Sequence, residues 1–148
     1  MAEGIGTLVF CRPDGDELFP LQSATLTVTR HESEVELLLY VRAERQSEGR
    51  RILSNAEVSI FLPQFDPAGL DGRRFEVPQS YDEEREDHVS CLYYYEHQDL
   101  NRNVVEVLGR EGGRFRIRWT GTTELDTYDG SEPESQVVIE GLFEFENG

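Results

Sequence analysis

Alternation of apolar and polar residues is clearest in the C-terminal part of the chain. Residues 113–120 alternate three apolar side chains with three arginines, and residues 137–146 alternate apolar side chains with glutamates. Successive side chains of a strand point to opposite faces, so both segments are predicted to be half-buried strands. We predict that they are antiparallel neighbours whose core residues are Phe115, Ile117, Trp119, Ile139, Phe143 and Phe145. Arginine–glutamate pairs across the outer face are expected to add about 0.2–1 kcal/mol each.

Shorter apolar runs occur along the rest of the chain, and Gly, Pro and Asp residues separate them. The predicted strands are residues 4–11, 25–30, 34–41, 58–62, 74–77, 89–96 and 104–108. Residues 43–55 and 79–88 are polar and are expected to be loops, and a capping-box pattern at Ser80–Glu83 allows one helical turn in the second. This pattern predicts one all-β domain over residues 1–148. Its expected architecture is an antiparallel two-sheet β-sandwich of about eight or nine short strands, with a barrel as the alternative.

Four apolar residues are predicted to lie on the outer side of this sandwich. Leu38 and Tyr40 have opposite parity to the core residues of their strand, and Leu92 and Tyr94 are assigned to the outer face of theirs. An apolar patch of this kind is typical of a binding surface, although a loop such as residues 43–55 could also cover it. We expect a homodimer that forms through this face, because a two-fold contact is the commonest solution for such a patch.

The net charge narrows the classes of partner. The chain of 148 residues carries a formal charge of −16, with 37% hydrophobic and 30% charged residues. That composition leans toward disorder, but the patterned apolar residues and the 10% aromatic content favour a folded protein. An acidic surface repels nucleic acid and anionic membranes and attracts basic proteins and divalent cations, although such charge also serves solubility alone. The N-terminus has no secretory signal and no segment is apolar enough to span a membrane, so a cytoplasmic protein is expected.

The residues that usually build catalytic sites are scattered. His31, His88 and His97 lie in turns or at strand ends, and Cys11 and Cys91 are expected to be free thiols inside strands. Cys91 and His97 are six residues apart, or roughly 20 Å along one strand, which is too far for a Cys–His pair. The chain has no lysine and no phosphate-binding loop. We therefore expect no catalytic site and no cofactor.

Two acidic loops are the candidate binding sites. In residues 124–134, Asp126 and Asp129 are candidate calcium ligands, but they are three residues apart and do not match an EF-hand, so a solvated turn is favoured. The second cluster is residues 82–87, where an arginine interrupts the acids. A sandwich can present both loops at its ends. The expected partner-binding residues are Asp82, Glu83, Glu84, Glu86, Asp87, Asp126, Asp129, Glu132 and Glu134.

These observations favour a non-enzymatic, acidic protein-binding domain. An inhibitor or immunity-type protein for a basic partner is an example of that class. A calcium- or carbohydrate-binding β-sandwich module is the alternative, and a hydrolase is the third hypothesis. A negative field speeds encounter with a cationic partner, and salt should weaken that effect.

Overall fold

The computed structural model describes residues 4–11, 15–94, 96–123 and 135–147. They form twelve strands and one short 3-10 helix, η1. The elements are β1 (Gly6–Cys11), β2 (Glu17–Arg30), β3 (Val35–Ser47), β4 (Arg50–Leu62), η1 (Pro67–Gly69), β5 (Arg74–Val77), β6 (Tyr81–Asp82), β7 (Asp87–His88), β8 (Ser90–Tyr94), β9 (Glu96–Gln98), β10 (Asn101–Glu111), β11 (Arg114–Thr123) and β12 (Ser135–Asn147). Within these ranges, no helix has the length and apolar character that crossing a membrane requires.

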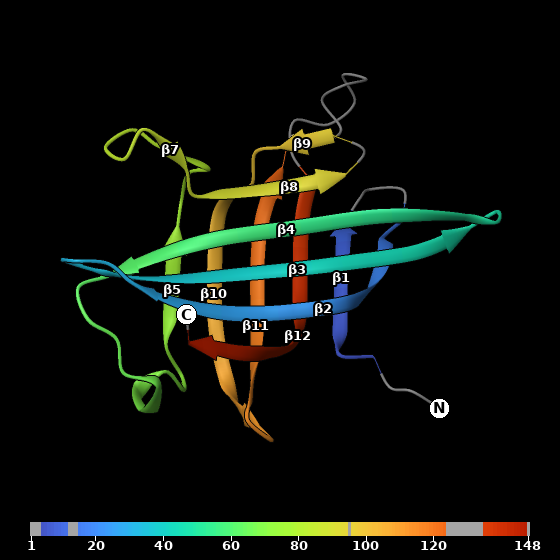
Figure 1. The fold of residues 1–148 in the computed structure, drawn as a ribbon. Coiled ribbons are helices and arrows are strands. Elements are labelled where there is room, and N and C mark those ends of the chain that lie inside the picture. The colour runs from blue at the N-terminus through green and yellow to red at the C-terminus, as the bar shows by residue number, and fades with distance from the viewer. Residues whose placement is uncertain (1–3, 12–14, 95, 124–134, 148) are drawn as a thin grey trace.

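Ten of the strands form a single curled sheet. Its order is β5-β10-β11-β12-β1-β2-β3-β4-β8-β9, and β6 and β7 pair with each other as a separate small hairpin. Figure 1 shows β2, β3, β4 and β8 running crosswise over β10, β11 and β12. The all-β, antiparallel prediction is confirmed. The predicted division into two sheets is not found, because continuous hydrogen bonding through β12, β1 and β2 makes the main sheet a half-barrel.

The sheet folds back on itself where β12 changes its neighbour. β12 pairs with β1 as far as Gly141, and from Glu144 it pairs directly with β2 in the parallel direction. Gly6 and Gly141 lie opposite each other at this change. A Cβ atom on Gly6 would lie 2.0 Å from the carbonyl oxygen of Glu140, so the backbones approach as closely as they do only because both residues lack side chains.

The predicted C-terminal strand pair is confirmed. β11 and β12 are antiparallel neighbours in one sheet, with Phe115 opposite Phe143 and Trp119 opposite Ile139. Trp119 is 0% exposed, and the other predicted core residues are buried except Phe145, which is half-buried and packs against the same cluster. Their shared parity directs these side chains into the concave side of the sheet.

The expected arginine–glutamate pairs are present on the outer side of this strand pair. Arg114 lies 3.3 Å from Glu144, and Arg118 lies 3.5 Å from Glu140. All four side chains are largely exposed, so each pair contributes little to stability, about 0–1 kcal/mol. The main consequence is electrostatic, since the arginines neutralise the glutamates of this half of the sheet.

The prediction that residues 43–55 form a loop is wrong. β3 continues to Ser47, β4 begins at Arg50, and the two pair in register along their whole length. Glu48 and Gly49 form the turn with φ values of 52° and 79°, as a two-residue hairpin turn requires. Figure 1 shows this hairpin extending beyond the other strands. Because both faces of the tip are in solvent, both carry polar residues. The tip therefore lacks the alternation of apolar and polar residues that would have identified a strand.

A buried polar cluster connects the two crossing parts of the sheet. Asn103 is 1% exposed; its amide nitrogen donates to the carbonyl oxygens of Val77 and Leu100 and to Ser90, and its oxygen accepts from Nε1 of Trp119 at 2.8 Å. Ser90 in turn donates to the carbonyl oxygen of Leu100. Residues 98–103 comprise the last residue of β9, a short connection and the beginning of β10.

Candidate functional site

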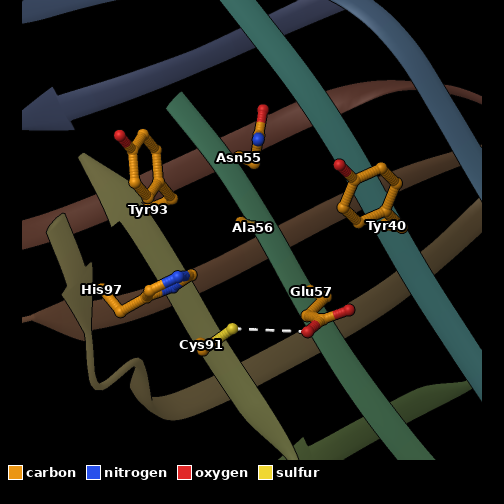
Figure 2. Close-up of a pocket in the computed structure, with 7 residues that line it drawn as sticks. All are labelled: Tyr40, Asn55, Ala56, Glu57, Cys91, Tyr93 and His97. Atoms are coloured by element: carbon orange, nitrogen blue, oxygen red, sulfur yellow. Dashed lines mark hydrogen bonds between the residues drawn. The ribbon is translucent and has the colours of Figure 1, made fainter. Parts of the chain in front are cut away.

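A pocket of about 320 Å³ lies on the outer face of β3, β4, β8 and β9 (Figure 2). Its volume lies at the lower end of the range of about 300–1,000 Å³ that is usual for ligand sites. Most of its lining is polar or aromatic. The lining residues are Tyr40, Asn55, Ala56, Glu57, Cys91, Tyr93 and His97. We call this site the outer pocket.

Strand pairing places the lining residues side by side. Glu57 lies opposite Tyr40 on β3 and opposite Cys91 on β8, while Asn55 lies opposite Tyr93. Figure 2 shows the two tyrosine rings on either side of β4, with Glu57 and Asn55 on the strand between them. The lining residues come from four strands, so no contiguous stretch of sequence predicts the pocket.

Glu57 and Cys91 form a hydrogen bond at the floor of the pocket. The thiol of Cys91 donates to Oε1 of Glu57 across 3.4 Å. Burial, together with the negative charge of Glu57, its hydrogen bond and the charge of Asp99, raises the pKa of Cys91 to about 12. The thiol is consequently protonated at neutral pH, and it lacks the thiolate form that nucleophilic catalysis requires.

The expected separation of Cys91 and His97 along one strand is wrong. The chain reverses after β8, so His97 on β9 lies opposite Tyr93, with their ring centroids 5.4 Å apart. Both Cys91 and His97 therefore line the outer pocket. Their proximity does not create a catalytic pair, because the thiol donates to Glu57 and has a raised pKa.

The predicted apolar patch of Leu38, Tyr40, Leu92 and Tyr94 does not form. Leu92 is 0% exposed and faces the core, and Tyr94 packs against the same core, whereas Leu38 and Tyr40 are half-buried on the outer side. A bend at Val89 precedes β8 and shifts its parity, and both parities of this strand are apolar, so the sequence did not reveal the shift. A homodimer stays a prediction without this surface to support it.

Arg85 joins the predicted acidic cluster of residues 82–87 to a second acidic segment. Its guanidinium donates to both carboxylate oxygens of Glu34 at 2.7 and 2.8 Å and lies 3.4 Å from the centroid of the Phe61 ring. These hydrogen bonds hold the pKa of Glu34 below its ordinary value. The tie is therefore present at neutral pH and is lost as the pH falls through that lowered pKa.

The two joined segments, residues 30–36 and 82–87, form what we call the acidic end. They hold eight carboxylates and two arginines. Four of the predicted partner-binding residues in the β6–β7 hairpin are exposed. Asp82 is half-buried, and its Oδ1 accepts hydrogen bonds from the backbone N–H groups of Glu84 and Arg85. The four exposed acids are Glu83, Glu84, Glu86 and Asp87. Residues 82–87 form the β6–β7 hairpin instead of the helical turn that the capping-box pattern allowed.

The acidic end and the outer pocket share one face of the sheet. Glu36 accepts a hydrogen bond of 2.7 Å from Ser59, and Leu38 and Tyr40 follow it at alternate positions of β3 on the same outer side. Four residues of strand span about 13 Å. We call this continuous surface the β3–β4–β8 face.

The other predicted acidic loop is residues 124–134. Asp126, Asp129, Glu132 and Glu134 lie outside the described residues. Elsewhere in the chain, within the ranges given above, no group of three His, Cys, Asp or Glu side chains is arranged to hold a metal ion.

The raised pKa of Cys91 leads to a prediction about its reactivity. In a Cys11→Ser variant, we expect the rate of alkylation by iodoacetamide to keep rising with pH beyond about 10, because only the thiolate reacts. An ordinary thiol, with a pKa near 8.5, would level off earlier. The measurement is a pH–rate profile by mass spectrometry.

The Glu57→Gln variant supplies the control for this profile. Loss of the carboxylate charge should move the profile to lower pH, since Glu57 both repels a thiolate and accepts the thiol hydrogen. If the alkylation rate of the Cys11→Ser variant with Glu57 intact levels off with a pKa near 8.5, Cys91 is not buried beside Glu57 in the way described.

The outer pocket is rich in hydrogen-bond acceptors. Glu57 has no ion-pair partner among the described residues, and Oδ1 of Asn55 is buried without a donor. The arrangement can bind a ligand that donates hydrogen bonds, and it lacks an activated nucleophile. No protein-family model, no curated protein and no solved structure matches the chain.

Proposed function

We propose that this protein is a non-enzymatic binding module whose β3–β4–β8 face recognises a basic protein. The observation that carries the proposal is the tie made by Arg85, which brings two acidic segments 51 residues apart onto one surface. Charges fixed close together attract a cationic partner more strongly than the same charges spread around the molecule. An inhibitor or immunity-type protein is the class that such a face suits.

The distribution of ion pairs elsewhere in the sheet also favours the β3–β4–β8 face as the binding surface. Among the described residues on the half of the sheet that carries β10, β11 and β12, five exposed acids are each paired with an arginine. These pairs are Arg74–Glu76, Arg110–Asp71, Arg114–Glu144, Arg116–Glu111 and Arg118–Glu140. Among the described residues, the acidic end has fewer arginines for its acids, so negative charge is concentrated there.

A neutralised variant tests the proposal with a synthetic arginine-rich peptide as the probe. We call residues 82–87 of the β6–β7 hairpin the acidic hairpin. We expect Asn and Gln substitutions there to slow association with the peptide by about tenfold or more, because electrostatic steering contributes factors of 10–10³ to association rates. The wild-type rate should fall steeply as NaCl is added, since exposed charges are screened beyond about 8 Å at physiological ionic strength. The changed residues are Asp82, Glu83, Glu84, Glu86 and Asp87. Stopped-flow fluorescence measures the rates.

A control variant neutralises the same number of acids on the other half of the sheet. It replaces the five paired acids of that half, namely Asp71, Glu76, Glu111, Glu140 and Glu144, with Asn or Gln. We expect its association rate to fall by less than about threefold, because these carboxylates are already paired. Equal slowing of both variants would mean that net charge alone attracts the peptide, and the proposed face would be wrong. Saturable stabilisation by calcium or by a sugar, without peptide binding, would favour the alternative module.

A further inference from the structure

The outer pocket presents hydrogen-bond acceptors that the described chain does not use. Oε1 of Glu57 accepts only the weak thiol donor of Cys91, and its second oxygen accepts no hydrogen bond from a described residue. Oδ1 of Asn55 is buried and likewise has no donor. A buried acceptor without a donor costs about 1–3 kcal/mol, so a ligand that supplied an N–H group here would relieve that cost.

The lining of the pocket carries a negative charge. Glu57 is the carboxylate in its lining, and the charge of Asp99 also acts on Cys91. The register places Arg42 opposite Asn55, but Arg42 is exposed and does not line the pocket. His97 is the remaining titratable group of the wall that could carry positive charge. A cation entering the pocket would therefore meet a carboxylate that has no cationic partner in the described chain.

The aromatic walls restrict the shape of that cation. Tyr40 and Tyr93 flank β4 two strand spacings apart, and Tyr93 lies opposite Asn55 while Tyr40 lies opposite Glu57, so the two positions are about 12 Å apart on the diagonal. A flat group lying over β4 can contact a ring at either side while its edge reaches Glu57. Aromatic faces attract cations, and a planar guanidinium can stack on a ring and donate hydrogen bonds at the same time.

We propose that the outer pocket receives one arginine side chain of the basic partner and acts as the anchor of the interface. This inference rests on the proposed function and adds the chemistry that the partner must present. The guanidinium donates to the free oxygen of Glu57, stacks against Tyr93 or Tyr40, and offers a further N–H to the amide of Asn55. A lysine ammonium has neither the planar face nor the fork of donors, so arginine is preferred.

The test uses L-argininamide as the probe and amide NMR as the readout. We expect saturable shifts at the backbone amides of Tyr40, Glu57 and Tyr93, with a dissociation constant on the order of millimolar, as suits a single side chain. Glu57→Gln keeps the shape of the side chain and should weaken binding about tenfold or more. Glu106→Gln is the matched control, because Glu106 is a half-buried glutamate of β10 on the other half of the sheet.

Neutral and alternative probes decide between explanations. We expect citrullinamide, the uncharged analogue of argininamide, to leave these amides unshifted and lysinamide to bind more weakly. Equal binding of citrullinamide or of a neutral sugar would overturn the anchor, since recognition would then not depend on the cation. Shifts that do not saturate and are the same in Glu57→Gln and Glu106→Gln would also overturn it.

The anchor and the proposed function can fail separately. If argininamide does not bind, but the arginine-rich peptide still depends on the acidic hairpin, the anchor is wrong and the acidic face stands. If argininamide binds at Glu57 while neutralising the hairpin leaves peptide association unchanged, the pocket is confirmed and the proposed steering is wrong. Unchanged urea-unfolding midpoints for both Gln variants would show that the differences arise from binding.

Discussion

Replacing Gly6 with alanine is expected to lower the free energy of unfolding by about 3–5 kcal/mol, or to prevent folding. The new Cβ would lie 2.0 Å from the carbonyl oxygen of Glu140 and 2.5 Å from Cα of Gly141. Both contacts are with backbone, so no side chain can rotate away to relieve them. The clash falls where β12 passes from β1 to β2, and separating these strands would open the half-barrel.

Gly109→Ala is the matched control for this prediction. Gly109 has nearly the same backbone angle as Gly6, with φ values of 158° and 157°, but nothing lies within 4 Å of its added Cβ. We expect Gly109→Ala to cost about 1–3 kcal/mol, because alanine rarely adopts this backbone angle, and Gly6→Ala to cost more because the clash is added to the same strain. Urea unfolding followed by tryptophan fluorescence measures both variants. Equal stability of the two variants would show that close approach at Gly6 does not hold the fold.

The second large effect is expected at Asn103. Asn103→Leu should destabilise the protein by about 3–4 kcal/mol, because it leaves buried groups on several elements without a partner. The carbonyl oxygen of Val77 and Nε1 of Trp119 would each lose a hydrogen bond. Leucine has a similar size, so the loss would come mainly from hydrogen bonding and not from a cavity.

Trp119→Phe provides the graded comparison. It removes only the Nε1 donor and part of the ring, and we expect a loss of about 1–2 kcal/mol. Since both changes break the same hydrogen bond, the double variant should be less destabilised than the sum of the single variants. Additive losses, or a loss below about 1 kcal/mol for Asn103→Leu, would contradict the role of this cluster in joining the two parts of the sheet.

The sequence predicted strands best where apolar and polar residues alternate regularly, although it missed the first part of β2, from Glu17 to Ala24, of which one side is buried. β11 and β12 were found with their neighbours, their core residues and their outer ion pairs, because both alternate over their length. β8 lies within the predicted strand of residues 89–96, but the chain reverses after Tyr94 into β9, and the core side of β8 was assigned wrongly because Cys91 and Leu92 belong to opposite faces that are both apolar. The tip of the β3–β4 hairpin was missed because strand residues that project into solvent carry no alternation; Glu48-Gly49 was the available turn signal.

The arrangement of the sheet depended on contacts that local pattern does not encode. The half-barrel arises where Glu144–Asn147 of β12 pairs with Thr25–Val28 of β2, more than 100 residues away in the sequence. The same limitation hid the outer pocket, whose walls come from β3, β4, β8 and β9. The acidic hairpin was identified from composition alone, but its joining to Glu34 through Arg85 was not, because an exposed arginine can pair with many acids.

Amide NMR mapping of the complex with the arginine-rich peptide tests the central claim most directly. We expect the perturbed amides to form one continuous area, from the acidic end at residues 30–36 and 82–87 across β3 and β4 to the outer pocket around Glu57 and Tyr93. The amides of β10, β11 and β12 should change little. Perturbations centred on β10, β11 and β12, or spread evenly over the surface, would contradict the claim that the β3–β4–β8 face is where this protein binds.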